Sequence, residues 1–109
     1  MMISKYQTIH ISSIMDKAMR KDCRVVSFRC HGLGDQDAIL ITKLIRSRPL
    51  ISSVDVSYNY MSDVGVSHVI GLAYSTDIVS VNISRNNFSK HTVKMIELLP
   101  EDIKEKVVF

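Results

Sequence analysis

Near the middle of the 109-residue chain lies the stretch that decides its fold, Ile51-Ser52-Ser53-Val54-Asp55-Val56-Ser57-Tyr58-Asn59-Tyr60-Met61-Ser62-Asp63-Val64-Gly65. Moved forward by 27 positions, Val54 falls on Val81 and Asn59 on Asn86; moved back by 28, Val54 falls on Val26. Apolar and polar residues alternate early in the stretch, which predicts a short strand. A unit that recurs at this period predicts a stacked row, because one unit alone leaves its apolar face exposed.

The second part of each unit has the apolar spacing of an amphipathic helix of roughly three turns. Its apolar positions are Ala38, Ile41, Leu44 and Ile45 in the first unit, Val66, Val69, Ile70 and Ala73 in the second, and Val93, Ile96 and Leu99 in the third. The expected N-cap or first-turn residues are Asp35, Asp63 and Ser89, and Pro49 and Pro100 lie just past two helix ends. The pattern predicts an α/β protein of three strand–turn–helix units.

A chain of 109 residues predicts a single domain, 1–109, and its three units are about the fewest that make a stable stack. We expect an N-terminal cap at 1–22, repeats at 23–50, 51–77 and 78–99, and a C-terminal cap or partial strand at 100–109. Within the cap, residues 8–21 predict a helix with one apolar side. Moved by 27, Val81 falls on Val108, so 107–109 predicts a truncated fourth strand, an exposed edge with no helix behind it.

The unit resembles the leucine-rich-repeat signature L-x-x-L-x-L-x-x-N-x-L. The matching positions are Ile51, Val54, Val56, Asn59 and Met61, then Ile78, Val81, Ile83, Asn86 and Phe88, and in a degenerate copy Cys23, Val26, Phe28, His31 and Leu33. The repeat length and the continuation through Gly65 are similar to the ribonuclease-inhibitor-like subclass. Over about residues 23–99, this resemblance implies a short solenoid with a parallel sheet on its concave face and helices on its convex face.

Asn59 and Asn86 stand where each strand is expected to bend away from the sheet. Backbone groups there still need hydrogen-bond partners, and a buried amide side chain can supply them across neighbouring units. The first unit departs from the pattern, because His31 occupies that place. An imidazole can both donate and accept, so we interpret His31 first as a structural residue.

Composition narrows the function classes. Apolar residues make up 46% of the chain, and the net charge is only +3. Residues 1–50 hold nine basic and four acidic residues, against five and seven in 51–109, which we interpret as a solvated surface rather than a basic end that steers an acidic partner. No apolar run predicts a membrane span or a secretory signal, so no membrane partner is expected. Two cysteines do not predict a disulfide framework, which favours a reducing cytosol.

Catalytic and metal-binding patterns are poor. Cys23 is expected to be buried, and Cys30 and His31 are expected to face opposite sides of a strand. His10, His68 and His91 fall on expected helices and are interpreted as solvated or half-buried residues. We therefore expect no metal, no cofactor and no enzymatic activity; a small enzyme using Cys30 and His31 and a nucleic-acid binder are the less favoured alternatives.

The strand residues that point away from the core form the expected binding surface. They are Val25, Ser27 and Arg29, then Ser53, Asp55 and Ser57, then Ser80, Asn82 and Ser84, followed at the bends by Cys30, His31, Tyr58, Tyr60, Arg85 and Asn87. Tyrosine and arginine dominate binding energy at protein interfaces. The protein-binding residues predicted from this pattern are Arg29, His31, Asp55, Ser57, Tyr58, Tyr60, Asn82 and Arg85. For Tyr60, packing on a neighbouring loop and partner binding are equally favoured.

The family resemblance implies a non-enzymatic protein-binding module, and some members of the subclass are stoichiometric enzyme inhibitors. We expect a regulator that covers the active site of an enzyme partner with its concave face. The short chain and degenerate repeats are similar to the leucine-rich-repeat effectors of intracellular bacterial pathogens, some of which restrain other effectors. Such a protein would act in the cytosol, or in a host cytosol after delivery without a classical signal peptide. The alternative is an adaptor or substrate-recognition subunit that binds a host protein.

Overall fold

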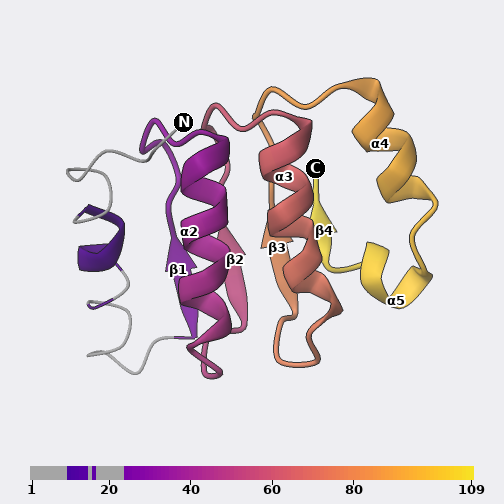
Figure 1. The fold of residues 1–109 in the computed structure, drawn as a ribbon. Coiled ribbons are helices and arrows are strands. Elements are labelled where there is room, and N and C mark those ends of the chain that lie inside the picture. Colours follow the sequence, from indigo (N-terminus) through magenta and orange to yellow (C-terminus); the bar gives the residue numbers. More distant parts are fainter. Residues whose placement is uncertain (1–9, 15, 17–23) are drawn as a thin grey trace.

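The computed structural model describes residues 10–14, 16 and 24–109, which form an α/β fold around a four-stranded parallel sheet. The strands are β1 (Val25–Ser27), β2 (Ser53–Asp55), β3 (Ser80–Asn82) and β4 (Val107–Val108), in that order across the sheet. The helices are α2 (Asp35–Arg46), α3 (Asp63–Ile70) with the 3-10 turn η1 (Gly71–Tyr74), α4 (Lys90–Glu97) and α5 (Glu101–Lys104). The predicted α/β class and parallel sheet are confirmed (Figure 1).

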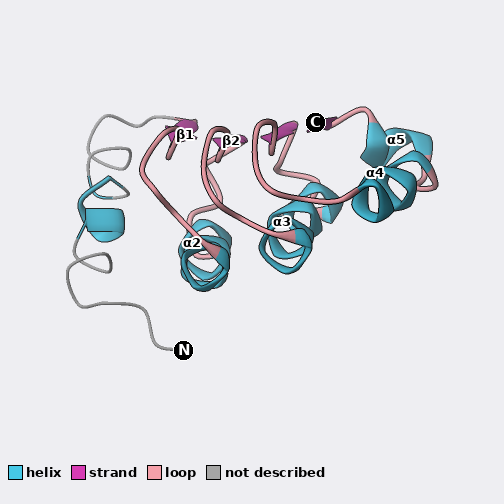
Figure 2. Cartoon of the chain, turned by 90° about the horizontal axis from the view of Figure 1, so that it is seen from above, coloured by secondary structure: helices cyan, strands magenta, loops and turns pink. Residues whose placement is uncertain are grey.

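Strands and helices form two layers. Figure 2 shows α2 and α3 on one side of the strands, with α4 and α5 beside the β4 end of the sheet. In the described part of the chain, no helix covers the other side of the strands. The core lies between the two layers, and it receives one side chain from each of the first three strands and one from the residue directly after each strand. These core residues are Val26 and Phe28, Val54 and Val56, and Val81 and Ile83.

The strand register pairs Val26 with Val54 and Val54 with Val81, as the shifts of 28 and 27 predict. The predicted fourth strand is present, but the predicted pairing of Val81 with Val108 was wrong by one residue. Val81 pairs with Val107, and Val108 pairs with Asn82. Only 6% of Val107 is exposed, against 47% of Val108, and a one-residue slip would exchange these faces. Burial of Val107 therefore sets the register.

Helix starts agree with the sequence better than helix lengths do. Asp35 and Asp63 are the first residues of α2 and α3, and Ser89 is the N-cap of α4. The helix α2 has the expected three turns, whereas α3 and α4 have eight residues each. After α3 the chain tightens into η1, which still buries Leu72 and Ala73. Sequence analysis did not predict α5, which buries Ile103 just before β4.

Residues 10–14 and 16 are helical, as predicted for this segment. Ile11 is fully buried in the core, and Ile14 packs against it. The remainder of the expected capping helix, and Cys23, lie outside the described residues. None of the helices that the structure describes is long and apolar enough to cross a membrane.

Two asparagine side chains tie successive bends together. Asn59 Oδ1 accepts hydrogen bonds from the N–H groups of His31 and Leu33, each at 3.0 Å. Its Nδ2 donates to the Phe28 and Val56 carbonyls, each at 2.9 Å. Asn86 makes the equivalent bonds: its Oδ1 accepts from the Met61 N–H, and its Nδ2 donates to the Val56 and Ile83 carbonyls. The expectation that these amides bridge neighbouring strand–turn–helix segments is confirmed.

Two aspartate side chains connect the starts of neighbouring helices, as the two asparagines connect neighbouring bends. Asp35 accepts hydrogen bonds from the Ser62 N–H and hydroxyl and from the Gly65 N–H, at the start of the next helix. A side chain at Gly65 would clash with Asp35, so only glycine fits this close approach. Asp63 accepts in the same way from the Ser89 N–H and hydroxyl and from the Thr92 hydroxyl.

A matched pair of valines tests the core. Val56 is fully buried and Val64 is 59% exposed. We expect Val56→Ala to lower the free energy of unfolding by about 1–3 kcal/mol, because it leaves a void, and Val64→Ala to change it by less than about 0.5 kcal/mol. Urea unfolding followed by circular dichroism measures both. Equal losses for the two variants would contradict the assigned core.

The hydrogen bonds that Asp63 accepts predict a pH dependence of stability. Hydrogen bonds from Thr92 and Ser89 hold the pKa of Asp63 below its ordinary value of 3.8. Its contribution is therefore complete above that value and is lost as the pH falls through the lowered pKa of the folded state. The stability difference between the parent protein and Asp63→Asn should be largest near neutral pH and shrink below pH 3.8. Urea unfolding from pH 7 to pH 3 measures it; Thr92→Val should weaken the same trend, and a constant difference would exclude it.

Candidate binding surface

The outer face of the sheet carries small and polar side chains. Val25 and Ser27 of β1 are exposed, and Ser53, Ser80 and Asn82 are half-buried. Asp55 accepts a hydrogen bond from the Ser57 N–H, and Asn82 accepts from the Ser84 N–H and hydroxyl. These two predicted binding residues therefore also fix the bends that follow their strands, while part of each side chain remains accessible.

At each bend the chain passes through a left-handed residue that is not glycine. Cys30, Tyr58 and Arg85 each have φ of 58°, and each lies three residues beyond the end of its strand. A side chain in this region costs about 1 kcal/mol or more. The Cys30 and Tyr58 N–H groups donate to the Ser57 and Ser84 carbonyls of the next bend. The conformation thus turns three equivalent side chains outward at one end of the sheet.

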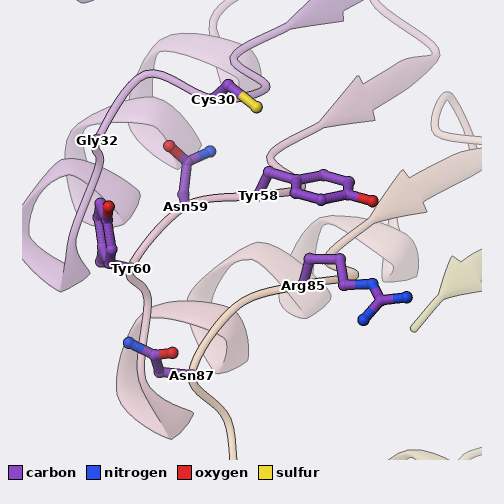
Figure 3. A pocket seen from close by; sticks show the side chains of 7 residues that line it. All are labelled: Cys30, Gly32, Tyr58, Asn59, Tyr60, Arg85 and Asn87. Atoms are coloured by element: carbon purple, nitrogen blue, oxygen red, sulfur yellow. The ribbon is translucent and has the colours of Figure 1, made fainter.

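These three residues line a surface hollow of about 420 Å³ together with Gly32, Asn59, Tyr60 and Asn87. Figure 3 shows Cys30, Tyr58 and Arg85 on successive turns of the chain, with the Tyr58 and Arg85 side chains extending in the same direction. Tyr58 is 46% exposed and Tyr60 is 70% exposed. The Arg29 guanidinium carbon lies 4.6 Å from the centre of the Tyr58 ring, within the range of a cation–π contact.

Four predicted residues therefore gather at the hollow or its rim, namely Arg29, Tyr58, Tyr60 and Arg85. Ser57 was wrongly predicted to be accessible, since only 2% of it is exposed. It lies in the middle bend, where its carbonyl accepts from the Cys30 N–H of the first bend and from the Asn59 side chain of its own bend. Ser57 is buried within this bend, which alternation along a strand does not predict.

His31 has a different environment from the one predicted. It lies with Cys30 in a turn rather than on a strand, and both are exposed. Its Nδ1 is 2.8 Å from Nε2 of His10 in the N-terminal helical segment. Burial of the ring, followed by the nearby charge of His10, lowers the pKa of His31 below its ordinary value of 6.5. His31 therefore does not replace the bridging asparagine; it joins the first bend to the N-terminal segment.

Sequence analysis did not assign Gly32 or Asn59 to the site, and it did not predict the left-handed conformation of Cys30, Tyr58 and Arg85. Gly32 has φ of 66°, which explains a glycine there. The signal for the left-handed residues is their shared place in the period, directly before Asn59 and Asn86 and directly before His31. Among the described residues, no group of three or more histidine, cysteine, aspartate or glutamate side chains could hold a metal ion.

Comparison with known proteins adds no assignment. No family model matches the chain, and no curated protein shows significant similarity to it.

The left-handed conformation at the bends predicts that a substitution by glycine there will not lower the free energy of unfolding. Arg85→Gly should leave the free energy of unfolding unchanged or raise it by up to about 1 kcal/mol, because it relieves the strained conformation. Asn87→Gly, two residues away at an exposed position with ordinary φ, should lower it by about 0.5–1 kcal/mol. Chemical unfolding measures both variants. A larger loss for Arg85→Gly than for Asn87→Gly would refute the strain argument.

Proposed function

We propose that this chain is a non-enzymatic protein-binding module of the leucine-rich-repeat kind, a short solenoid of three strand–turn–helix repeats. The observation that carries the proposal is the row of Cys30, Tyr58 and Arg85, held in left-handed conformations around one hollow. Backbone strain of this kind persists where surrounding structure enforces it, and it clusters at functional sites. Here the side chains of Asn59 and Asn86 bond the backbone before and after Cys30 and Tyr58.

The chemistry of the hollow suits a protein partner. Tyr58, Tyr60, Arg29 and Arg85 are residue types that dominate binding energy when a partner covers them. Beside them, the small side chains of Ser53 and Ser80 leave the sheet accessible to a partner's loop. A partner could therefore place a side chain in the hollow and rest a loop on the strands.

The proposed partner is an enzyme whose active site this surface covers. A standard interface takes about 800 Å² from each protein, which a domain of this size can supply from one face. Inhibition would follow from occupancy alone, with no chemistry by the module. We place the protein in the cytosol, of its own cell or of a host cell, as an effector that restrains another protein.

Two double variants test the proposal. Arg29→Ala with Tyr58→Ala removes the pair at the rim of the hollow. Arg46→Ala with Tyr74→Ala removes an exposed arginine and an exposed tyrosine from α2 and η1. Both variants should melt within a few degrees of the parent protein, because all four side chains are exposed.

We expect the Arg29/Tyr58 variant to bind its partner at least about tenfold more weakly, and the Arg46/Tyr74 variant to bind like the parent. The partner is captured from the native lysate and identified by mass spectrometry, and its affinity is then measured with purified protein. Inhibition of that partner at one-to-one stoichiometry would support the inhibitor assignment. Equal binding by the Arg29/Tyr58 variant would exclude the outer sheet face as the interface.

A further inference from the structure

Two histidines meet where the N-terminal helical segment reaches the bend after β1. His10 Nε2 and His31 Nδ1 are 2.8 Å apart, and the ring centres are 4.8 Å apart with the rings tilted by 47°. These residues are 21 positions apart in the chain, so their meeting depends on the fold. Figure 2 shows the described part of the N-terminal helix beyond β1, at the opposite end of the sheet from β4.

We propose that His10 and His31 together bind a divalent transition-metal ion of the zinc and nickel class. Imidazole nitrogens bind such ions at about 2.0–2.1 Å. Two nitrogens on one ion are then about 2.9 Å apart at a right angle and about 3.3 Å apart at the tetrahedral angle. The observed separation of 2.8 Å lies within a few tenths of an ångström of the first value. Octahedral nickel, with its ligands at right angles, therefore needs the smaller adjustment, and tetrahedral zinc needs the two nitrogens to move slightly farther apart.

The surroundings allow that adjustment. His31 is exposed and His10 is half-buried, so the rings can rotate and water can occupy the other coordination positions. Imidazole is a preferred ligand of zinc, copper and nickel, whereas calcium and magnesium prefer oxygen ligands. With two protein ligands the site is open, and its affinity will be lower than that of a closed four-ligand site.

Binding the ion changes the protons of the pair in a defined way. In the hydrogen-bonded pair, one of the two facing nitrogens carries a proton and the other accepts it. Metal binding requires a lone pair on both facing nitrogens. The donating ring must therefore carry its proton on its other nitrogen, so that both rings stay neutral and no proton is lost from a neutral pair. The ion then replaces the shared proton as the link between the N-terminal segment and the first bend.

Thermal unfolding of the full chain with zinc chloride or nickel chloride tests the site. Ions that bind only the folded state raise the melting temperature in proportion to the logarithm of their concentration. At a concentration tenfold above the dissociation constant, we expect a rise of about 6 °C, reversed by EDTA. Cys30→Ser should keep this rise, which separates imidazole binding from thiol binding.

His31→Ala and His10→Ala should each abolish most of the rise, while His68→Ala, which removes an exposed histidine from α3, should keep it. Because His10→Ala could loosen the N-terminal segment, a second measurement uses the parent protein alone. Paramagnetic nickel should selectively broaden the NMR signals of the His10 and His31 rings. Absence of a rise in the parent, an equal rise in His31→Ala, or broadening centred on other histidines would overturn the proposal.

Discussion

The side-chain amide of Asn59 is the interaction on which the rest of the structure depends. A chain that leaves a parallel sheet must turn its backbone groups away from their ladder partners, and buried groups without partners are costly. The amide supplies two acceptor bonds, to the N–H groups of His31 and Leu33, and donates to carbonyls of its own bend and of the preceding one. Asn86 repeats the arrangement one step along the sheet. Each bend is thus defined by the next one.

The hollow follows from this constraint. To bring its amide beneath the preceding bend, the chain must turn sharply just before Asn59, and Tyr58 takes the left-handed conformation that allows it. The same requirement places Arg85 before Asn86, and Cys30 takes the same left-handed conformation before His31. Side chains at this position cannot fold back over the core, so they project outward. The backbone that stabilises the stack therefore also exposes three variable side chains in a row, which is what a binding surface needs.

Much of the fold could be predicted from the sequence because the repeat carries the information several times. The strand register from β1 to β3, the starts of α2, α3 and α4, and the bridging role of Asn59 all follow from one pattern. The predicted fold was wrong or incomplete in the C-terminal tail, where the repeated sequence pattern no longer applies. The tail strand was misplaced by one residue because burial of Val107, rather than the period, sets its register. The helix α5 has no equivalent in the other units.

The site was less predictable because it depends on what lies beside each residue. Alternation along β1 placed Arg29 correctly on the outside, and the position of Tyr58, Tyr60 and Arg85 at the bends placed these three there as well. Alternation failed for Ser57, which is buried in the bend after β2. It was also silent on His10 and His31, because a contact between residues 21 positions apart leaves no trace in local periodicity.

The first bend serves both proposed sites, and its hydrogen bonds separate them. The backbone of this bend is fixed by Asn59 Oδ1, which accepts from the N–H groups of both His31 and Leu33, and by the Leu33 carbonyl, which accepts from Tyr60. The His31 ring extends from this fixed backbone to His10, whereas Cys30 and Gly32 on either side line the hollow. Rotation of the ring onto a metal ion can therefore occur while the wall of the hollow stays in place. Loss of metal binding would leave the protein-binding surface intact, and loss of the Arg29 and Tyr58 side chains would leave the histidine pair intact.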